Sequence, residues 1–381
     1  MEHSVILSAV RTPLGRRGKG LAEVHPATLL GRVQRAAIEA AGVDPATVGQ
    51  VIGGCVAQVG EQAFNVTRTA WLSEGLPESV GASTVDAQCG SSQQALTLAA
   101  ALVGAGVVDL ALACGVESMT RIPIGSNFRK DFELGRPVPK DYLRRYEFLN
   151  QYQAAERIAE KWGVTREQAD EFGLSSQVRA ATAWSEGRFD GQIVPVTAPD
   201  GTVVDRDEGL RETSLDKLAE LKAVVPDGVH TAGNASQISD GASAVLVASE
   251  RKAAELGREP LARIVDTATV GVDPVMMLLG PHAATPMLLE RNKLSIDDMD
   301  LVEINEAFAS IVLSWQRDSG AGSERINPNG GAIALGHPLG GTGCVLTTKA
   351  THELRRSSGR YGLVTMCCGG GLGTATLLER L

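Results

Sequence analysis

The sequence predicts an α/β protein that is built from two similar halves, with a domain of different character inserted into the first half. Three observations support this prediction. Two pairs of segments share a single offset of 251 residues, apolar strands alternate with helices in both halves, and a polar, irregular stretch lies between them. We therefore expect mixed or parallel sheets that are covered by helices.

The repeat is visible in two separate places. Residues 43–52 (VDPATVGQVI) align with residues 294–303 (LSIDDMDLVE), and both read as a capped short helix followed by the start of a buried strand. The same offset aligns residues 110–118 (LALACGVES) with residues 361–369 (YGLVTMCCG), two apolar strands that end in small residues. Agreement of both pairs on one offset favours a duplicated unit.

The elements along the chain define three predicted parts. The apolar start VILSAVRT fits a first strand, and residues 241–249 (GASAVLVAS) read as a buried strand that returns to the first half. Between them, QAAERIAEKWGV has the periodicity of an amphipathic helix. We expect a first half at residues 1–118 and 241–257, an inserted domain at 119–240, and a second half at 258–381.

Composition limits the classes of partner and compartment. The 381 residues carry a net charge of -9, which argues against general binding to nucleic acid or anionic membranes, and no apolar run approaches the ~20 residues of a bilayer span. Six cysteines in so long a chain do not form a disulfide framework. The start of the sequence does not have the order of a signal peptide and the end is no peroxisomal address, so we expect a cytoplasmic protein.

Cys89 raises the main chemical question, because in STVDAQCGSSQQA it stands among small residues where a helix is expected to begin. It could be a buried filler, half of a disulfide or a nucleophile. The repeat aligns Cys89 with Gly340, three residues after His337, so two related helix starts should face each other. A helix N-terminus lowers the pKa of a thiol, and an imidazole can accept its proton. We therefore expect Cys89 to be an activated nucleophile.

Two further segments contain candidate groups. Cys367 ends the strand of MCCGGGLG, whose glycines allow backbone N–H groups to approach a ligand, although Cys367 and Cys368 could instead be a vicinal redox pair or a cramped strand end. Asn305 in NEAFA follows a buried strand, where it could hold a water, donate to an oxyanion or cap a helix. The glycines lack a dinucleotide-binding order and the histidines lack metal-ligand spacing, so we expect no metal site.

Over essentially its whole length the chain resembles the thiolases. The matching segments are VDAQCGSSQQA, VEINEAFA, NPNGGAIALGHPLGGTG and MCCGGGLG, with TAGNASQISDGASAV leading out of the inserted domain. The resemblance implies a duplicated thiolase fold with a five-layered αβαβα core and an inserted loop domain that binds coenzyme A. It further implies acyl-CoA and CoA as partners, CoA as a substrate with no other cofactor, and a homodimer or homotetramer.

The resemblance also implies roles for individual residues. Cys89 would carry the acyl group and His337 would activate it, forming one oxyanion hole together with a water held by Asn305. Cys367 would be the second acid/base, and the backbone N–H groups of Cys89 and Gly369 would form a second oxyanion hole. Cys368 stands where relatives usually have Ile or Val and receives no role. The implied contacts to CoA or substrate are Gln151, Arg211, Thr213, Lys222, Ala232, Ser236 and Phe308; for the charged members a solvated face is the alternative.

One departure from the family bears on the substrate. Many thiolases carry a Met-Gly pair at the acyl tunnel where this sequence has Asn150-Gln151. Together with CGSSQQA and GGCVAQVGEQAFNVTRTAWL, this resembles an actinobacterial branch that acts on sterol-derived acyl-CoA, which implies a bulky acyl group. The predicted function is thiolytic cleavage of a 3-ketoacyl-CoA to acetyl-CoA or propionyl-CoA in fatty-acid or steroid side-chain β-oxidation. The alternatives are a biosynthetic acetyl-CoA acetyltransferase, a ketoacyl synthase, a non-catalytic lipid or CoA carrier, and a scaffold subunit.

Overall fold

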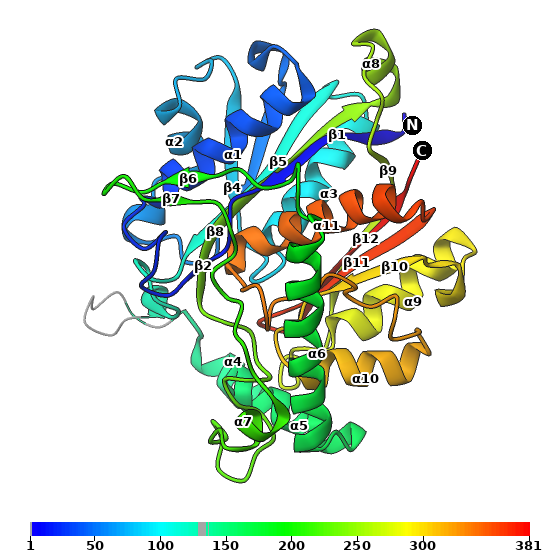
Figure 1. Cartoon of the computed structure of the whole chain (residues 1–381). Helices are drawn as coiled ribbons and strands as arrows, with labels where there is room; N and C mark the ends of the chain where they lie inside the picture. The colour runs from blue at the N-terminus through cyan, green and yellow to red at the C-terminus, as the bar shows by residue number, and fades with distance from the viewer. Residues whose placement is uncertain (1, 129–134, 136) are drawn as a thin grey trace.

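Both halves of the protein contribute to one mixed sheet, in a computed structural model that describes residues 2–128, 135 and 137–381 (Figure 1). The strands follow the order β10-β11-β12-β9-β1-β8-β5-β3-β4. The first half supplies β1 (Ser4–Arg11), β3 (Gln50–Gly54), β4 (Gly81–Val85), β5 (Leu110–Ser118) and β8 (Ser239–Ser249). The second half supplies β9 (Ala262–Gly271), β10 (Leu301–Ile304), β11 (Tyr361–Cys368) and β12 (Leu372–Glu379).

The duplication extends to the register of the strands. β3 and β5 are parallel with Gln50 opposite Ala111, and β10 and β11 are parallel with Leu301 opposite Gly362, so both partners are shifted by the predicted 251 residues. Each pair is extended by an antiparallel strand, β8 beside β5 and β12 beside β11. The halves meet where β1 pairs antiparallel with β9.

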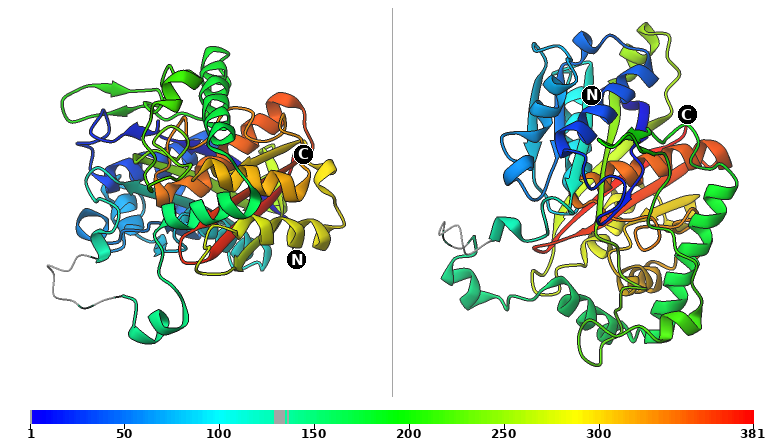
Figure 2. Two further views of the ribbon diagram at one scale, coloured as in Figure 1. Left: turned by 90° about the horizontal axis from the view of Figure 1, so that it is seen from below. Right: turned by 60° about the vertical axis from the view of Figure 1, so that its left-hand side comes forward.

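Helices form three layers around the strands of the two halves. One outer layer holds α1 (Pro26–Ala41) and α2 (Val66–Ser73), and the other holds α9 (Gly280–Asn292) and α10 (Ala309–Ser319). The middle layer holds α3 (Ser91–Gly104) and α11 (Thr342–Ser357), which pack together and against strands of both halves (Figures 1 and 2). One apolar core joins each outer helix layer to the strands of its own half, and a third core joins the middle helices to strands of both halves. The strands of the two halves are the two β layers, which confirms the predicted αβαβα order.

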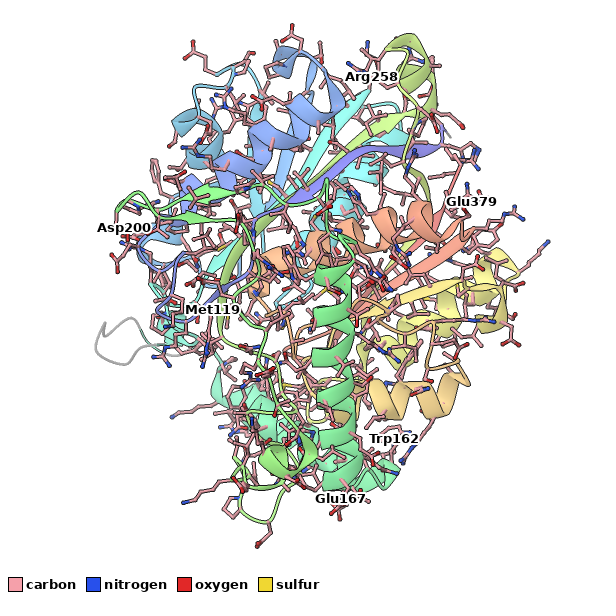
Figure 3. All side chains as sticks on the ribbon, viewed as in Figure 1. Met119, Trp162, Glu167, Asp200, Arg258 and Glu379 are labelled. Carbon is pink, nitrogen blue, oxygen red and sulfur yellow. The ribbon has the colours of Figure 1, made fainter. Side chains whose placement is uncertain are left out.

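The inserted segment forms a group of helices beside the layered core. It contains α4 (Lys140–Arg145), α5 (Gln151–Trp162), α6 (Arg166–Ser185), the ribbon of β6 (Val196–Thr197) and β7 (Val203–Val204), and α7 (Leu215–Ala219). Figure 3 labels Met119, just past the end of β5, and Trp162 and Glu167 at the far end of the segment. The predicted amphipathic helix is α5, which buries Ala154, Ala155, Ile158 and Ala159.

A buried ion pair fastens the inserted segment to the first strand. The Arg11 guanidinium donates to both Asp207 oxygens, at 2.6 and 2.9 Å, and neither side chain is exposed. Short elements complete the chain, namely β2 (Gly15–Arg16), which pairs with β8, and α8 (Glu250–Glu255). Among the described residues, no helix combines the length and the apolar character that crossing a membrane requires.

Candidate active site

Cys89 lies in a tight turn between β4 and α3. Gln88 has a φ of +53°, a left-handed conformation that costs energy in a residue with a side chain. The turn is held by Asp86, whose Oδ1 accepts from the Gln88 N–H at 2.7 Å, and by Ser91, whose Oγ accepts from the Ala87 N–H at 3.0 Å. Cys89 then directly precedes Gly90, the N-cap of α3. The sequence therefore placed the cysteine correctly at a helix start.

The expected low pKa of Cys89 is wrong for the free protein. The pKa of this thiol is raised to about 11, mainly by burial and to a smaller extent by the nearby charges of Glu117 and Asp86. The backbone N–H groups of Gly369 and of Cys89 itself act in the opposite direction, because they stabilise the thiolate. Only 4% of Cys89 is exposed, so desolvation outweighs the effect of the helix start.

The other two thiols come from the end of β11. Burial raises the pKa of Cys367 and of Cys368, and in both cases the nearby Cys89 thiol contributes. The Cys368 sulfur also packs against Gly90, because a Cβ added to Gly90 would lie 2.7 Å from it, while the Gly90 N–H donates to the Ala87 carbonyl at 3.2 Å. All six cysteines of the chain are free and buried, so Cys367 and Cys368 form no disulfide.

His337 and Asn305 form the second part of the cluster. The His337 Nδ1 lies 2.6 Å from the Thr342 Oγ1, which donates its own proton to the Pro338 carbonyl, so Nδ1 carries the imidazole proton. The unprotonated Nε2 faces the Asn305 Nδ2 at 3.3 Å. Burial lowers the pKa of His337 to about 4, which keeps the ring neutral near pH 7. No hydrogen bond joins His337 to Cys89 in the part of the chain that is described.

Asn305 is not a helix cap. α10 begins at Ala309 and Phe308 is its N-cap, so Asn305 lies in the loop between β10 and α10. The side chain is fully buried, and its Oδ1 has no hydrogen-bond partner among the described residues. A buried amide oxygen without a partner is costly, so this atom is free to accept from a ligand or a water.

Several of the predicted CoA and substrate residues lie along the edge of the inserted segment. Arg211 is half-buried and donates to the Ala232 carbonyl at 3.2 Å, and burial and the charge of Arg16 lower its pKa. The Ser236 N–H donates to Ala307 at 2.9 Å, beside Phe308. Lys222 is exposed and Thr213 is half-buried, and neither makes a hydrogen bond to these residues in the described chain.

Gln151 is the predicted substrate residue with the clearest placement. It is the first residue of α5, and its Nε2 would lie 3.6 Å from a Cβ added to Gly369, whose N–H lowers the pKa of the Cys89 thiol. Its neighbour Asn150 has a different task, since its side chain caps α5 in a reciprocal pair with Gln153. Only one member of the Asn150-Gln151 pair, Gln151, is therefore shown to lie beside Gly369.

Sequence reasoning missed three residues that shape this cluster. Gln88 gives no signal in the sequence, and Thr342, which orients His337, lies in a glycine-rich run without other marks. Glu117 could have been found, because it is the lone carboxylate in the apolar strand LALACGVES. It is 1% exposed and accepts a hydrogen bond from the Gly340 N–H, three residues after His337.

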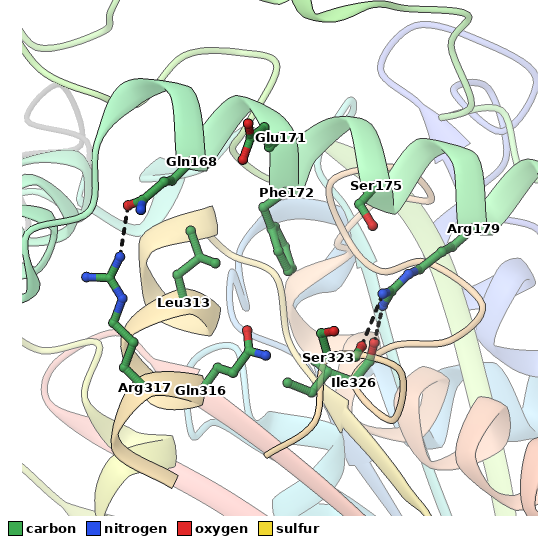
Figure 4. A pocket seen from close by; sticks show the side chains of 10 residues that line it. All are labelled: Gln168, Glu171, Phe172, Ser175, Arg179, Leu313, Gln316, Arg317, Ser323 and Ile326. Atoms are coloured by element: carbon green, nitrogen blue, oxygen red, sulfur yellow. Dashed lines mark hydrogen bonds between the residues drawn. The ribbon is translucent and has the colours of Figure 1, made fainter. Parts of the chain in front are cut away.

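A surface pocket of about 310 Å³ lies elsewhere, between α6 and α10 (Figure 4). None of the predicted catalytic or CoA-binding residues lines it. Its two arginines are already engaged, because Arg179 donates to carbonyls of Ser323 and Ile326 and Arg317 donates to Gln168. Within the described residues, no group of three or more His, Cys, Asp or Glu side chains is arranged to hold a metal ion.

Comparison with known proteins places this cluster in a family. Residues 4–251 match the family model described as "Thiolase, N-terminal domain", and residues 258–380 match the one described as "Thiolase, C-terminal domain". The steroid 3-ketoacyl-CoA thiolase FadA6 of Mycobacterium tuberculosis is 46% identical, covering 100% of this chain and 95% of the relative. A beta-ketoadipyl-CoA thiolase of Acinetobacter baylyi is 43% identical, with full coverage of both chains.

A solved structure agrees with these relatives. The acetyl-CoA acetyltransferase of Bacillus anthracis superposes with a TM-score of 0.93 at 38% identity, covering 100% of this chain and 99% of that one. The fold is duplicated, Cys89 lies at a helix start and Cys367 at a strand end, and the family models match both halves of the chain. The chain therefore belongs to the thiolase family of acyltransferases.

Proposed function

We propose that the protein cleaves 3-ketoacyl-CoA esters with CoA, through an acyl group carried on Cys89. One observation carries the proposal: Gly369 lies beside the nucleophile turn, where a Cβ added to it would lie 3.2 Å from the Gln88 Oε1, and the N–H groups of Gly369 and Cys89 both favour the Cys89 thiolate. Paired donors at this position would stabilise the negative charge that develops on a carbonyl oxygen during attack by sulfur. Cys367 lies close enough for its charge to interact with that of Cys89, and so supplies a second acid/base at the same site.

The groups divide the reaction into two half-reactions. The neutral His337 accepts the Cys89 proton at Nε2, and the thiolate adds to the keto carbon. The Cα–Cβ bond then breaks, its electron pair forms the enolate of acetyl-CoA, and Cys367 protonates that enolate. In the second half, the Cys367 thiolate takes the proton of incoming CoA, the CoA sulfur displaces Cys89 from the acyl group, and the departing Cys89 thiolate recovers its proton from His337. The Asn305 Oδ1 without a partner supports a bound water that donates to the thioester oxygen.

We further propose a bulky, ring-bearing acyl group. The relative named as a steroid 3-ketoacyl-CoA thiolase supports this, since it is 46% identical over the whole chain. In this protein Gln151 stands beside Gly369, and Cys367 belongs to an apolar cluster that includes Leu149, Met277, Leu278 and Phe308. A cytoplasmic homodimer or homotetramer that needs no cofactor besides its substrate CoA completes the proposal.

The acyl-enzyme is the first prediction to test. Brief incubation with acetoacetyl-CoA should add one acetyl group to the wild-type protein, and later addition of CoA should remove it. Intact-protein mass spectrometry measures both steps. Cys89→Ala should show no increment, whereas Cys114→Ala, which removes a buried thiol that contacts Gln34 and Ile52 instead, should behave as wild type. An acetyl group on Cys89→Ala, or none on the wild type, would contradict the proposal.

The acyl preference is a second prediction. We expect kcat/KM for a ring-bearing 3-ketoacyl-CoA to exceed that for a straight-chain substrate, and Gln151→Ala to change their ratio by roughly 10-fold, because one side chain at a pocket wall discriminates on that scale. Arg157→Ala is the matched control, an exposed residue on the same helix that pairs with Glu147. Preference for acetoacetyl-CoA in the wild type would favour the biosynthetic alternative.

A further inference from the structure

Glu117 is a buried carboxylate whose surroundings consist of donors. Its Oε2 accepts from the N–H groups of Val56 and Gly340, both at 2.9 Å, and its Oε1 accepts from the Ala57 N–H at 3.0 Å and the Gln62 Nε2 at 2.7 Å. No lysine or arginine pairs with it within the described chain. A buried carboxylate without a counter-ion is expensive to keep, unless hydrogen bonds compensate.

The four donors require the ionised form of Glu117. A proton on either oxygen would face an N–H group, and one or more hydrogen bonds would be lost. A glutamine could replace only one of the two oxygens that these donors use. Burial still raises the pKa of Glu117, so the carboxylate is held at a cost that the four hydrogen bonds partly offset.

Gly340 connects this carboxylate to the histidine turn, residues 337–341. A Cβ added to Gly340 would lie 2.6 Å from the Val116 carbonyl oxygen and 2.8 Å from the Glu117 Oε2, so the turn is pressed against the end of β5. The next glycine, Gly341, accepts from the Ser243 hydroxyl at 2.7 Å. Among these contacts, the one with Glu117 is the only charged one, and hydrogen bonds to a charged group are stronger than neutral ones.

The internal repeat gives independent support. The offset of 251 aligns Glu117 with Cys368, and each residue lies in the last two positions of a strand of one half while it contacts the helix start of the other half. Glu117 accepts from the Gly340 N–H before α11, and the Cys368 sulfur packs against Gly90 before α3, where a Cβ added to that glycine would lie 2.7 Å from the sulfur. The two positions therefore support the two turns that carry His337 and Cys89.

We propose that Glu117, as a carboxylate, is a positioning residue that holds the histidine turn in place for proton transfer from Cys89, and that Cys368 is its counterpart at the nucleophile turn. The proposal rests on the catalytic roles given above for Cys89 and His337. Glu117 acts through the Gly340 backbone and does not itself touch the reacting atoms.

A double-mutant cycle distinguishes an effect of Glu117 on the position of His337 from a general disturbance of the protein structure. The rate constant of Cys89 acylation is measured by single-turnover mass spectrometry for wild type, Glu117→Gln, His337→Ala and the double variant. Glu117→Gln alone should slow acylation about 10- to 100-fold, as expected when a catalytic group is displaced by about 1 Å. In the His337→Ala background the same change should have almost no effect, because its influence passes through His337. Equal effects in both backgrounds would overturn the proposal.

Three measurements complete the test. Glu353→Gln is the control, because it changes another carboxylate of α11 that lies eleven residues, or ~16 Å, along the helix from Thr342. This variant should be acylated at the wild-type rate. Glu117→Gln should also shift the pH midpoint of Cys89 alkylation downward, since a negative charge near that thiol is removed. If Glu117→Gln does not fold, Glu117→Asp replaces it in the cycle and should show the same coupling to His337. Absence of acylation in the wild type would refute the proposed function, whereas wild-type rates in a folded Glu117 variant would refute this inference alone.

Discussion

The Cys89 thiol combines two opposing influences at a single atom. Two N–H groups favour its thiolate, but burial and the charges of Glu117 and Asp86 disfavour it. The balance leaves the free enzyme with a protonated thiol and a neutral His337 near pH 7. Such a pair reacts when the substrate is in place and the proton can move to the imidazole, and it stays unreactive toward other electrophiles otherwise.

This balance predicts slow, strongly pH-dependent alkylation of Cys89. With a pKa of about 11, roughly one molecule in 10⁴ carries the thiolate at pH 7, and the rate with iodoacetamide should rise about tenfold for each pH unit up to pH 10. The sign follows from the raised pKa, because the thiol form dominates at every pH below it. A rate that levels off between pH 7 and 8 would show a low-pKa thiolate instead. Mass spectrometry of the modified protein measures the rate.

At the scale of the element, helix starts place the reactive groups. α3 begins just after Cys89, α11 just after the histidine turn, and α5 at Gln151. α5 and α6 carry the same cap, in which Asn150 pairs with Gln153 and Thr165 pairs with Gln168. The two caps share the same reciprocal pattern of hydrogen bonds, but only the first lies beside the residue that is next to Gly369.

This pair of caps gives a matched comparison. Asn150→Ala and Thr165→Ala should each lower the free energy of unfolding by about 1 kcal/mol, the usual cost of losing a cap. Only Asn150→Ala should also lower kcat/KM, because it loosens the helix start that holds Gln151. Chemical denaturation and steady-state kinetics provide the two values. Equal kinetic losses for both variants would argue against a role of Gln151 in substrate binding.

Much of the element pattern was predictable from the sequence because the repeat is encoded in local periodicity. The strands near residues 110–118 and 361–369 and the helix starts after Cys89 and His337 are all found in the structure. The raised pKa of Cys89 was not predictable, because it arises from burial and from Glu117, which reaches the site only through strand pairing. The role of Asn305 was ambiguous for a similar reason, because the sequence alone does not distinguish a helix cap from a buried amide in a loop.

At the scale of the whole molecule, the inserted segment must keep a fixed relation to the layered core if Arg211 and Gln151 are to face one substrate. The fully buried Arg11–Asp207 pair helps to hold the inserted segment against the first strand. The Trp184 indole N–H also donates to Asp207 at 3.2 Å. Several donors thus converge on one carboxylate between the first strand and α6.

This arrangement predicts a large loss of stability when one partner is removed. Arg11→Met should lower the free energy of unfolding by about 3–5 kcal/mol, because Asp207 is left as a buried charge without a counter-ion. The double variant Arg11→Met with Asp207→Leu should recover most of that loss. Arg251→Met, which removes an exposed arginine from three surface pairs, is the control and should change stability little. Denaturant melts measure all three variants, and a small effect of Arg11→Met would contradict the argument.

The pairing of β1 with β9 has a consequence for how the chain reaches its native state. Ser4 pairs with Ile264, so the junction between the halves closes a loop of about 260 residues, and pairings of such long range form slowly. On the ribosome the segment that carries Cys89 emerges long before the segments that carry His337 and Cys367. Until synthesis is nearly complete, the thiol therefore lacks both of its partners and the burial that keeps it protonated, and it is more open to oxidation in this interval than in the folded protein.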